Sequence, residues 1–247
     1  MSLLDIFKKK EAEGTEDESA FSVEDRGYER VLKYGSITYS KLKGESVYTG
    51  EYWDYFLPAA CISRNRSALL IGLGGGTVAF QLSALFVDAL SLDVVELSKR
   101  VIEMARKFAP KMKANIVAGE GAAYVATTNK RYGAMLLDAY VSSKIPEQFL
   151  QRKFIEDAHR VLSEDGVLAV NYAMSMMGAL RYRDYVSKLK ERFIVFKVSA
   201  AMFEGNVIIL CSKRLGKDEL LDRIEANMPK SRESEPVLRN YYNMMPL

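Results

Sequence analysis

An apolar run that leads directly into a glycine cluster most constrains the fold of this 247-residue chain. Residues 68–77 read ALLIGLGGGT, and a second, mostly apolar run at residues 92–95, which read LDVV, ends at Glu96. The first run predicts a buried parallel strand, because such strands are covered on both faces. The glycines allow a tight turn and let a ligand approach the main chain at a helix N-terminus. A carboxylate after the next strand suits a ribose diol, so the pattern predicts a nucleotide-type site.

Strand and helix patterns alternate after the glycine cluster. This alternation predicts an α/β fold with a doubly wound, mostly parallel, seven-stranded sheet. The expected strands are residues 68–71, 92–95, 114–117, 134–137, 167–170, 194–198 and 207–211. The expected helices are residues 78–85, 98–108, 122–127, 149–162 and 175–192. Too little chain separates the last two strands for a crossover helix, so we expect a C-terminal β-hairpin.

The chain is expected to divide into four parts. Residues 1–20 contain an acidic stretch without apolar periodicity, which predicts a mobile leader. Residues 21–60 carry β-branched and aromatic residues between turn glycines, which predicts a small N-terminal β appendage and a connection. Residues 61–215 form the expected Rossmann-like domain. Residues 216–247 predict a surface helix and an aromatic, methionine-rich tail that docks on a protein surface.

The composition excludes several classes of protein. Lys and Arg number 35 against 32 Asp and Glu, a balance that gives no indication of a nucleic-acid partner. Cys61 and Cys211 lie far apart in apolar surroundings, which is typical of reduced thiols and favours a cytoplasmic location. No signal peptide or apolar run of bilayer length is present, so no membrane association is expected. The isolated cysteines and a single histidine, His159, predict no protein-held metal.

The spacing of the glycines disfavours a dinucleotide. Counting from Gly72, the third glycine of the dinucleotide fingerprint falls on Thr77, and what remains is Gly72, Gly74 and Gly76. An NAD-dependent dehydrogenase is therefore less favoured than a protein that binds another adenosine-bearing cofactor.

Six segments together resemble the spermidine synthase-like branch of the class I S-adenosylmethionine-dependent methyltransferase superfamily. They are residues 69–77, 94–97, 101–105, 119–121, 136–138 and 160–167, and the resemblance covers roughly residues 45–212. It implies a group transferase that uses S-adenosylmethionine or its decarboxylated form. It also implies a homodimer as one assembly, because members of the family often dimerise.

The resemblance assigns the cofactor to residues at the carboxyl ends of the strands. It places Gly72, Gly74 and Gly76 beside the methionine part of the cofactor. Glu96, followed by Leu97, would accept hydrogen bonds from both ribose hydroxyls. The adenine amino group would be bound by Glu120, which stands with Gly121 in the family's Gly-Asp-Gly position.

Asp138 matches the catalytic acid of the family and also belongs to the expected cofactor site. It would orient an amine nucleophile or take its proton as the amine attacks the carbon next to the sulfonium. Tyr52 and Asp54 resemble the segment that holds the amine, and Tyr140 is expected to wall the acceptor pocket. The implied partner is therefore a small-molecule acceptor, with an amine as the leading candidate.

The chain departs from the polyamine-forming members in two places. Those members continue Asp-Ser-Ser/Thr-Asp-Pro where this chain reads Asp138-Ala139-Tyr140-Val141, and they carry an aspartate where this chain has Gly75. Burying a polycationic amine needs compensating carboxylates. The sequence therefore favours methyl transfer to an unidentified acceptor, with aminopropyl transfer as the alternative. A noncatalytic cofactor-binding module is a second alternative.

Overall fold

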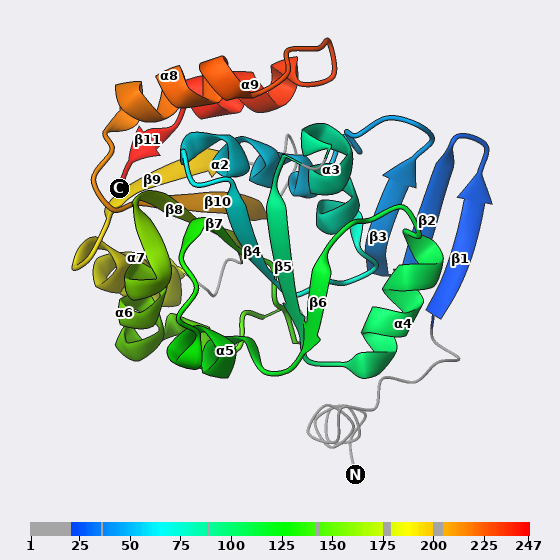
Figure 1. Cartoon of the computed structure of the whole chain (residues 1–247), viewed down its shortest axis with the longest axis horizontal. Coiled ribbons are helices and arrows are strands. Elements are labelled where there is room, and N and C mark those ends of the chain that lie inside the picture. Colours follow the sequence, from blue (N-terminus) through cyan, green and yellow to red (C-terminus); the bar gives the residue numbers. More distant parts are fainter. Residues whose placement is uncertain (1–20, 36, 88, 142–143, 175–178, 200–204) are drawn as a thin grey trace.

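The computed structural model contains two β-sheets and describes residues 21–35, 37–87, 89–141, 144–174, 179–199 and 205–247 (Figure 1). The expected leader, residues 1–20, lies outside the described residues. The smaller sheet consists of β1 (Phe21–Arg26), β2 (Glu29–Tyr34) and β3 (Ile37–Lys43), all paired antiparallel. It is the N-terminal β appendage expected from the sequence.

The larger sheet has the strand order β11-β9-β10-β8-β7-β4-β5-β6. In chain order its strands are β4 (Ser67–Ile71), β5 (Ser91–Glu96), β6 (Asn115–Ala118), β7 (Tyr132–Leu137), β8 (Leu162–Ala173), β9 (Ile194–Ser199), β10 (Asn206–Ser212) and β11 (Met245–Pro246). The strands β8, β7, β4, β5 and β6 pair in parallel, while β10 pairs antiparallel with both β8 and β9. The doubly wound fold and the C-terminal hairpin are thus confirmed.

The tail adds a strand that the apolar pattern did not indicate. Met245 pairs with Lys197 of β9, and the Leu247 amide donates a hydrogen bond of 2.9 Å to the Val195 carbonyl. The strand is only two residues long, which is too short for an alternation of side chains to mark it in the sequence. The tail docks on its own chain.

Helices cover both faces of the larger sheet (Figure 1). One core contains side chains of η2 (Tyr52–Phe56), α2 (Leu57–Ile62), α3 (Thr77–Phe86), α4 (Lys99–Phe108), α8 (Lys217–Asn227) and α9 (Glu235–Tyr242). The other contains side chains of α5 (Gly121–Thr127), η3 (Glu147–Leu150), α6 (Arg152–Val161) and α7 (Ala179–Lys190). The helix expected at 149–162 is interrupted, because Gln151 is extended, with φ −84° and ψ 147°. None of the described helices is both long and apolar enough to cross a bilayer.

Strand β4 runs through the centre of this arrangement. Its side chains alternate between the two cores: Ala68 and Leu70 pack in one, while Leu69 and Ile71 pack in the other. This burial on both faces explains the continuous apolar run before the glycines. Because β4, β5 and β7 are parallel, the loops after them gather at one edge of the sheet.

Candidate active site

The glycine loop after β4 needs glycine because its backbone is left-handed and closely packed. Gly72, Gly74 and Gly76 have φ values of 90°, 53° and 90°, and Gly76 is the residue before α3. A Cβ atom on Gly72 would lie 2.5 Å from the carbonyl oxygen of Asp138. The loop therefore lies directly against the backbone that carries the candidate catalytic acid.

Gly75 packs against the small N-terminal sheet. Its amide donates a hydrogen bond of 2.8 Å to Ser40 Oγ of β3. A Cβ atom on Gly75 would lie 2.5 Å from Ser40 Cβ and 2.8 Å from Leu32 Cδ2. The absence of a side chain at this position is thus explained by close packing between the loop and the appendage.

We expect Gly75→Asp to lower the free energy of unfolding by about 1–3 kcal/mol, because Ser40 and Leu32 leave no room for the new side chain. Urea denaturation measures this change. The matched control is Gly216→Asp, since Gly216 precedes α8 with φ −76° and nothing lies within 4 Å of a built Cβ. An aspartate there is a favourable helix cap, so the control should be unchanged or slightly more stable. Equal stability of Gly75→Asp and the wild type would refute the packing explanation.

Glu96 lies at the end of β5, where backbone amides hold its carboxylate. Its Oε2 accepts a hydrogen bond of 2.9 Å from the Leu73 amide, and its Oε1 accepts one of 2.9 Å from the Ser98 amide. Burial raises the pKa of Glu96, while these hydrogen bonds oppose the rise. The next side chain, Leu97, is apolar but 64% exposed. The two carboxylate oxygens of Glu96 are therefore held in place beside the glycine loop and the exposed Leu97 side chain.

Glu120 caps the N-terminus of α5. Its carboxylate accepts hydrogen bonds from the amides of Ala122 and Ala123, at 3.0 and 2.6 Å. Gly121 lets the helix approach β4, because a Cβ there would lie 2.4 Å from Ile71 Cγ2. The residue expected to bind adenine thus also satisfies two of the free amides at this helix end. Its role towards adenine stays a prediction.

Asp138 follows β7, and its amide donates a hydrogen bond of 2.9 Å to the Ile71 carbonyl of β4. Its Oδ1 accepts a hydrogen bond of 2.8 Å from Asn171 Nδ2, and its Oδ2 accepts one of 3.5 Å from the Tyr52 hydroxyl. Burial raises the pKa of Asp138 to about 7, although the hydrogen bonds from Asn171 and Tyr52 lower it. A carboxyl group with this pKa can exchange a proton near neutral pH.

Tyr140 joins the loop after β7 to β8. Its hydroxyl donates a hydrogen bond of 2.7 Å to the Asn171 carbonyl and accepts one of 2.9 Å from the Ala173 amide. The phenol oxygen is therefore occupied by backbone groups, and the ring is held in place two residues beyond Asp138. The structure brings Tyr52, Tyr140 and Asp138 together around Asn171.

Asn171 was not among the residues expected from the sequence. It is 1% exposed, and its Oδ1 accepts a hydrogen bond of 2.9 Å from Asn206 Nδ2. The available signal was a lone asparagine directly after the apolar run at 167–170. A polar side chain buried in a strand needs a partner, but the sequence alone does not identify that partner.

Asp54 lies in the same 3₁₀ helix as Tyr52 but has other partners. Its buried carboxylate accepts hydrogen bonds from the Thr49 amide at 2.9 Å, the Thr49 hydroxyl at 2.8 Å, the Gly50 amide at 2.8 Å and Gln81 Nε2 at 2.6 Å. Burial raises the pKa of Asp54, and these hydrogen bonds oppose that rise. Through Asp54, these four hydrogen bonds join the chain before η2 to Gln81 of α3.

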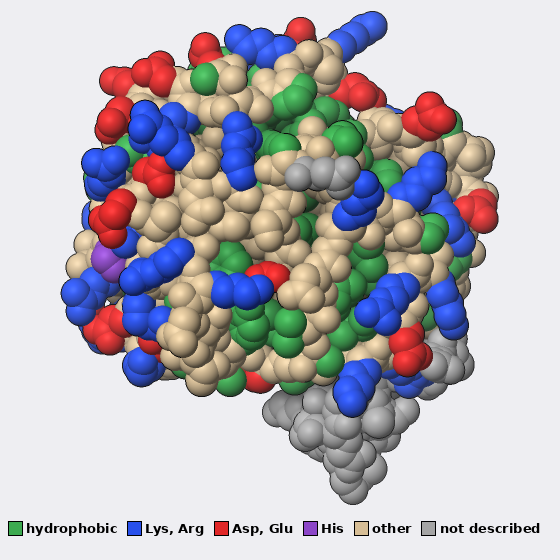
Figure 2. Space-filling model, in the orientation of Figure 1, with side chains coloured by type: hydrophobic (Ala, Val, Ile, Leu, Met, Phe, Trp, Pro, Cys, Tyr) green, Lys and Arg blue, Asp and Glu red, His purple; other side chains and the backbone are tan. Residues whose placement is uncertain are grey.

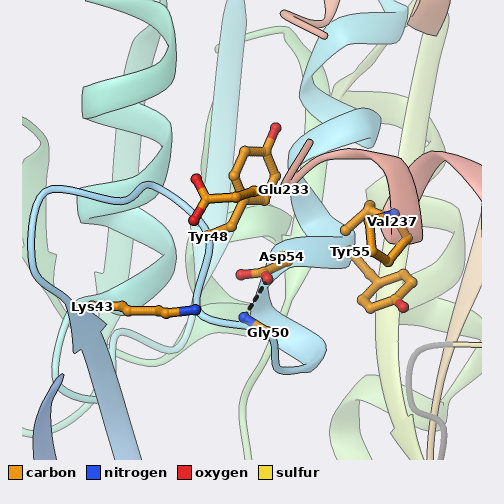
Figure 3. A pocket seen from close by; sticks show the side chains of 8 residues that line it. Lys43, Tyr48, Gly50, Asp54, Tyr55, Glu233 and Val237 are labelled. Carbon is orange, nitrogen blue, oxygen red and sulfur yellow. Dashed lines mark hydrogen bonds between the residues drawn. The ribbon is translucent and has the colours of Figure 1, made fainter. Parts of the chain in front are cut away.

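Asp54 also lines a cavity of about 220 Å³ between the chain before η2 and the start of α9 (Figure 3). The lining side chains include Lys43 and Glu233, which have opposite charges, and Figure 3 shows Asp54 bonded to the Gly50 amide. This cavity includes neither Asp138 nor Tyr52 in its lining. The two members of the expected amine-holding segment thus belong to different surroundings.

The described part of the chain gives little support for a metal site, a reactive thiol or a strongly basic surface. No group of three or more His, Cys, Asp or Glu residues lies close enough there to hold a metal ion. Both cysteines are buried free thiols, and burial raises the pKa of Cys61 to about 12. On the face shown in Figure 2, basic side chains are interspersed with acidic ones. The strand ends around Asp138 are therefore the best candidate for an active site.

A comparison with known protein families matches residues 56–209 to the spermine/spermidine synthase domain. The chain belongs to the spermine/spermidine synthase family. The resemblance found in the sequence is thus confirmed, and it extends over more than half of the chain.

Two relatives in this family carry the name polyamine aminopropyltransferase. The one from Vibrio vulnificus is 26% identical over 231 residues, which cover 85% of this chain and 77% of the relative. The one from Chromobacterium violaceum is 31% identical over 155 residues, which cover 60% of this chain and 58% of the relative. Among solved structures, a probable spermidine synthase from Corynebacterium glutamicum aligns with a TM-score of 0.68 at 16% identity, covering 89% of this chain and 82% of that chain. That structural match supports the fold.

The preference for methyl transfer is wrong. The names of these two relatives, together with the match to the spermine/spermidine synthase domain, contradict it and favour the alternative, aminopropyl transfer. The preference rested partly on Gly75, where polyamine-forming members have an aspartate. Position 75 packs against Ser40 of β3, so the missing aspartate has an explanation in packing that does not involve the acceptor.

Proposed function

We propose that this protein is a polyamine aminopropyltransferase, which transfers the aminopropyl group of decarboxylated S-adenosylmethionine to an amine. The observation that carries the proposal is the Asp138 carboxyl group, bonded to Tyr52 and Asn171 at the edge of the sheet where the glycine loop lies. The membership of the family and the names of the relatives support the same reaction.

The donor would bind along the carboxyl ends of β4, β5 and β6. Glu96 offers two carboxylate oxygens in one plane to the ribose hydroxyls, and the exposed Leu97 side chain offers an apolar surface to adenine. The full set proposed to contact the donor is Gly72, Gly74, Gly76, Glu96, Leu97, Glu120, Gly121 and Asp138. All of these residues belong to the Rossmann-like domain, residues 61–215. The appendage and connection, residues 21–60, contribute Tyr52 to the acceptor side of the site.

The acceptor amine would bind between Tyr52, Tyr140 and Asp138. Its nitrogen lone pair attacks the aminopropyl carbon next to the sulfonium, so a C–N bond forms as the C–S bond breaks. The electron pair of that bond stays on sulfur, which leaves as neutral methylthioadenosine. The Asp138 carboxylate takes the proton that the nitrogen loses and passes it to solvent. Asp54 is assigned to holding η2, since chain donors surround its carboxylate.

The rate of transfer should depend on pH through Asp138. Burial raises the pKa of this carboxyl group to about 7, and only the ionised form can accept a proton. Protonation of Asp138 should therefore slow transfer as the pH drops below about 7. The free fraction of the acceptor amine, whose pKa is near 10 for an ordinary alkyl amine, falls about tenfold for each pH unit over the whole range, so protonation of Asp138 should appear as a steeper fall below about pH 7. Initial rates between about pH 5.5 and 8.5 test this expectation, and a slope of the logarithm of the rate against pH that stays constant over this range would contradict it.

The proposed reaction is tested by incubating the purified chain with decarboxylated S-adenosylmethionine and putrescine. Equimolar methylthioadenosine and spermidine are the expected products. A parallel incubation with S-adenosylmethionine serves as the control. Formation of S-adenosylhomocysteine there, without methylthioadenosine in the first incubation, would overturn the proposal. Binding of either donor without any product would favour a noncatalytic module. The assembly state, for which a homodimer is proposed, is measured on the same sample by light scattering.

A further inference from the structure

A chain of side-chain hydrogen bonds leads from the C-terminal hairpin to Asp138. Asn206, the first residue of β10, donates from its Nδ2 to Asn171 Oδ1 on β8 at 2.9 Å. Asn171 in turn donates from its Nδ2 to Asp138 Oδ1 at 2.8 Å. The strands follow one another in the sheet as β10, β8 and β7, so the bonds cross it in one direction.

The two ends of the Asn171 amide are chemically opposite, and only one orientation suits a carboxylate. Nδ2 donates, whereas Oδ1 can only accept, so a flipped amide would place an acceptor against the ionised Asp138. Asn171 is 1% exposed, which leaves its side chain little access to water as a substitute partner. The Asp138 carboxylate favours this orientation from one side, and a neighbour on the other side supports it. That neighbour is the Asn206 N–H group, which bonds to Oδ1.

We infer that Asn206 is a positioning residue, which holds the Asn171 amide with its N–H group towards Asp138 and so favours the ionised form of that carboxylate. Its importance for catalysis rests on the proposed function, in which Asp138 accepts a proton. Asn206 itself bonds to Asn171 and is not proposed to contact the substrates.

Burial raises the pKa of Asp138, and among the groups that contact this carboxyl the Asn171 amide is the main one that opposes the rise. Tyr52 approaches from η2, Tyr140 comes from the same loop as Asp138, and Asn171 comes from β8, with Asn206 of β10 bonded behind it. None of these four side chains is charged at neutral pH. If Asn171 is free to turn, its Oδ1 can accept the proton of a neutral Asp138 carboxyl group. That hydrogen bond stabilises the protonated form, so the pKa of Asp138 should rise.

The test is a direct titration of Asp138 in the full chain without substrates. Carbon-13 labelling of aspartate carboxyl groups follows the titration by NMR, and Asp138→Asn identifies the resonance. We expect Asn206→Leu to move the midpoint upwards by about one pH unit. Asn206→Ala, which also lacks the donor but is smaller, should move it in the same direction. Asn227→Leu is the matched control, because Asn227 bonds to Arg66 and Arg223 instead, and its midpoint should equal the wild-type value.

A double variant separates a positioning role of Asn206 from general damage to the fold. In Asn171→Leu the amide is gone, so adding Asn206→Leu should cause no further shift of the midpoint. An unchanged midpoint in both Asn206 variants, or an equal shift in the Asn171→Leu background, would overturn the inference. In the plot of transfer rate against pH, the fall caused by protonation of Asp138 should shift by the same amount as the midpoint of its titration. If the wild type forms no methylthioadenosine, the proposed function fails, while the titration still decides the role of Asn206.

Discussion

Asp138→Asn should reduce the formation of methylthioadenosine by about 100- to 10,000-fold, the usual contribution of a positioned general base. The amide has nearly the same shape as the carboxyl group but cannot take the proton of the attacking amine. The neighbouring bonds from Tyr52 and Asn171 show that the side chain is held in one place. Single-turnover rates at pH 8 with saturating donor and acceptor measure the effect.

The control for this variant is Asp157→Asn. Asp157 is also a buried carboxylate, but it lies on α6 with Lys153 and Arg160 as its partners. Its replacement should leave the rate within a few-fold of the wild type, as expected for a residue remote from the chemistry. Equal activity of Asp138→Asn and Asp157→Asn would remove Asp138 from the reaction.

The stability of Asp138→Asn provides an independent check of the buried carboxyl group. The pKa of Asp138 is about 7 in the folded protein against an ordinary value of 3.8, so the folded state holds a proton that the unfolded state releases. This contribution to stability is fully present below the unfolded value and is lost as the pH rises from about 4 to about 7. The wild type should therefore lose stability relative to Asp138→Asn across this range, measured by urea denaturation.

Gly72→Ala should damage both the fold and the reaction. The new Cβ would lie 2.5 Å from the Asp138 carbonyl oxygen and 2.8 Å from its carbon, in a backbone with φ 90°. Relief of this contact requires the loop and the end of β7 to separate. We expect the free energy of unfolding to fall by about 2–4 kcal/mol. Displacement of Asp138 by about 1 Å should slow transfer by about 100-fold as well.

Gly119→Ala is the matched control for stability. Gly119 follows β6 at the same edge of the sheet, its φ is not positive, and nothing lies within 4 Å of a built Cβ. An alanine there should change the free energy of unfolding by less than about 1 kcal/mol. Similar losses in the two variants would mean that the contact between Gly72 and Asp138 is not the cause.

The sequence predicts the parts of this fold that local patterns control. The apolar run before the glycines identifies β4, and the surface helix expected within residues 216–247 is present as α8. Strand β8 extends from Leu162, well before the expected start at 167, because Leu162 pairs with Tyr132 although polar residues follow it. Pairing between strands, which local composition does not record, sets that boundary.

In the candidate site, too, the sequence predicts the residues that follow local patterns and misses those that depend on tertiary contacts. Asp138 and Glu96 stand directly after apolar strands, so their place at the edge of the sheet follows from the pattern. The separation of Tyr52 from Asp54 does not follow, because it depends on donors from Gln81 and on the turn at Thr49. One strand, β8, lies between β10, which carries Asn206, and β7, which Asp138 follows, so only the assembled structure reveals the link.

The two-residue strand β11 covers part of the outer edge of β9 in the larger sheet. Without Met245–Pro246, the outer main-chain groups of β9 would be unpaired, and such an edge is a template for joining another chain. The Leu247 amide extends the cover to Val195. Residues far from the proposed chemistry therefore contribute to colloidal stability, by keeping the end of the sheet from growing into a neighbouring molecule.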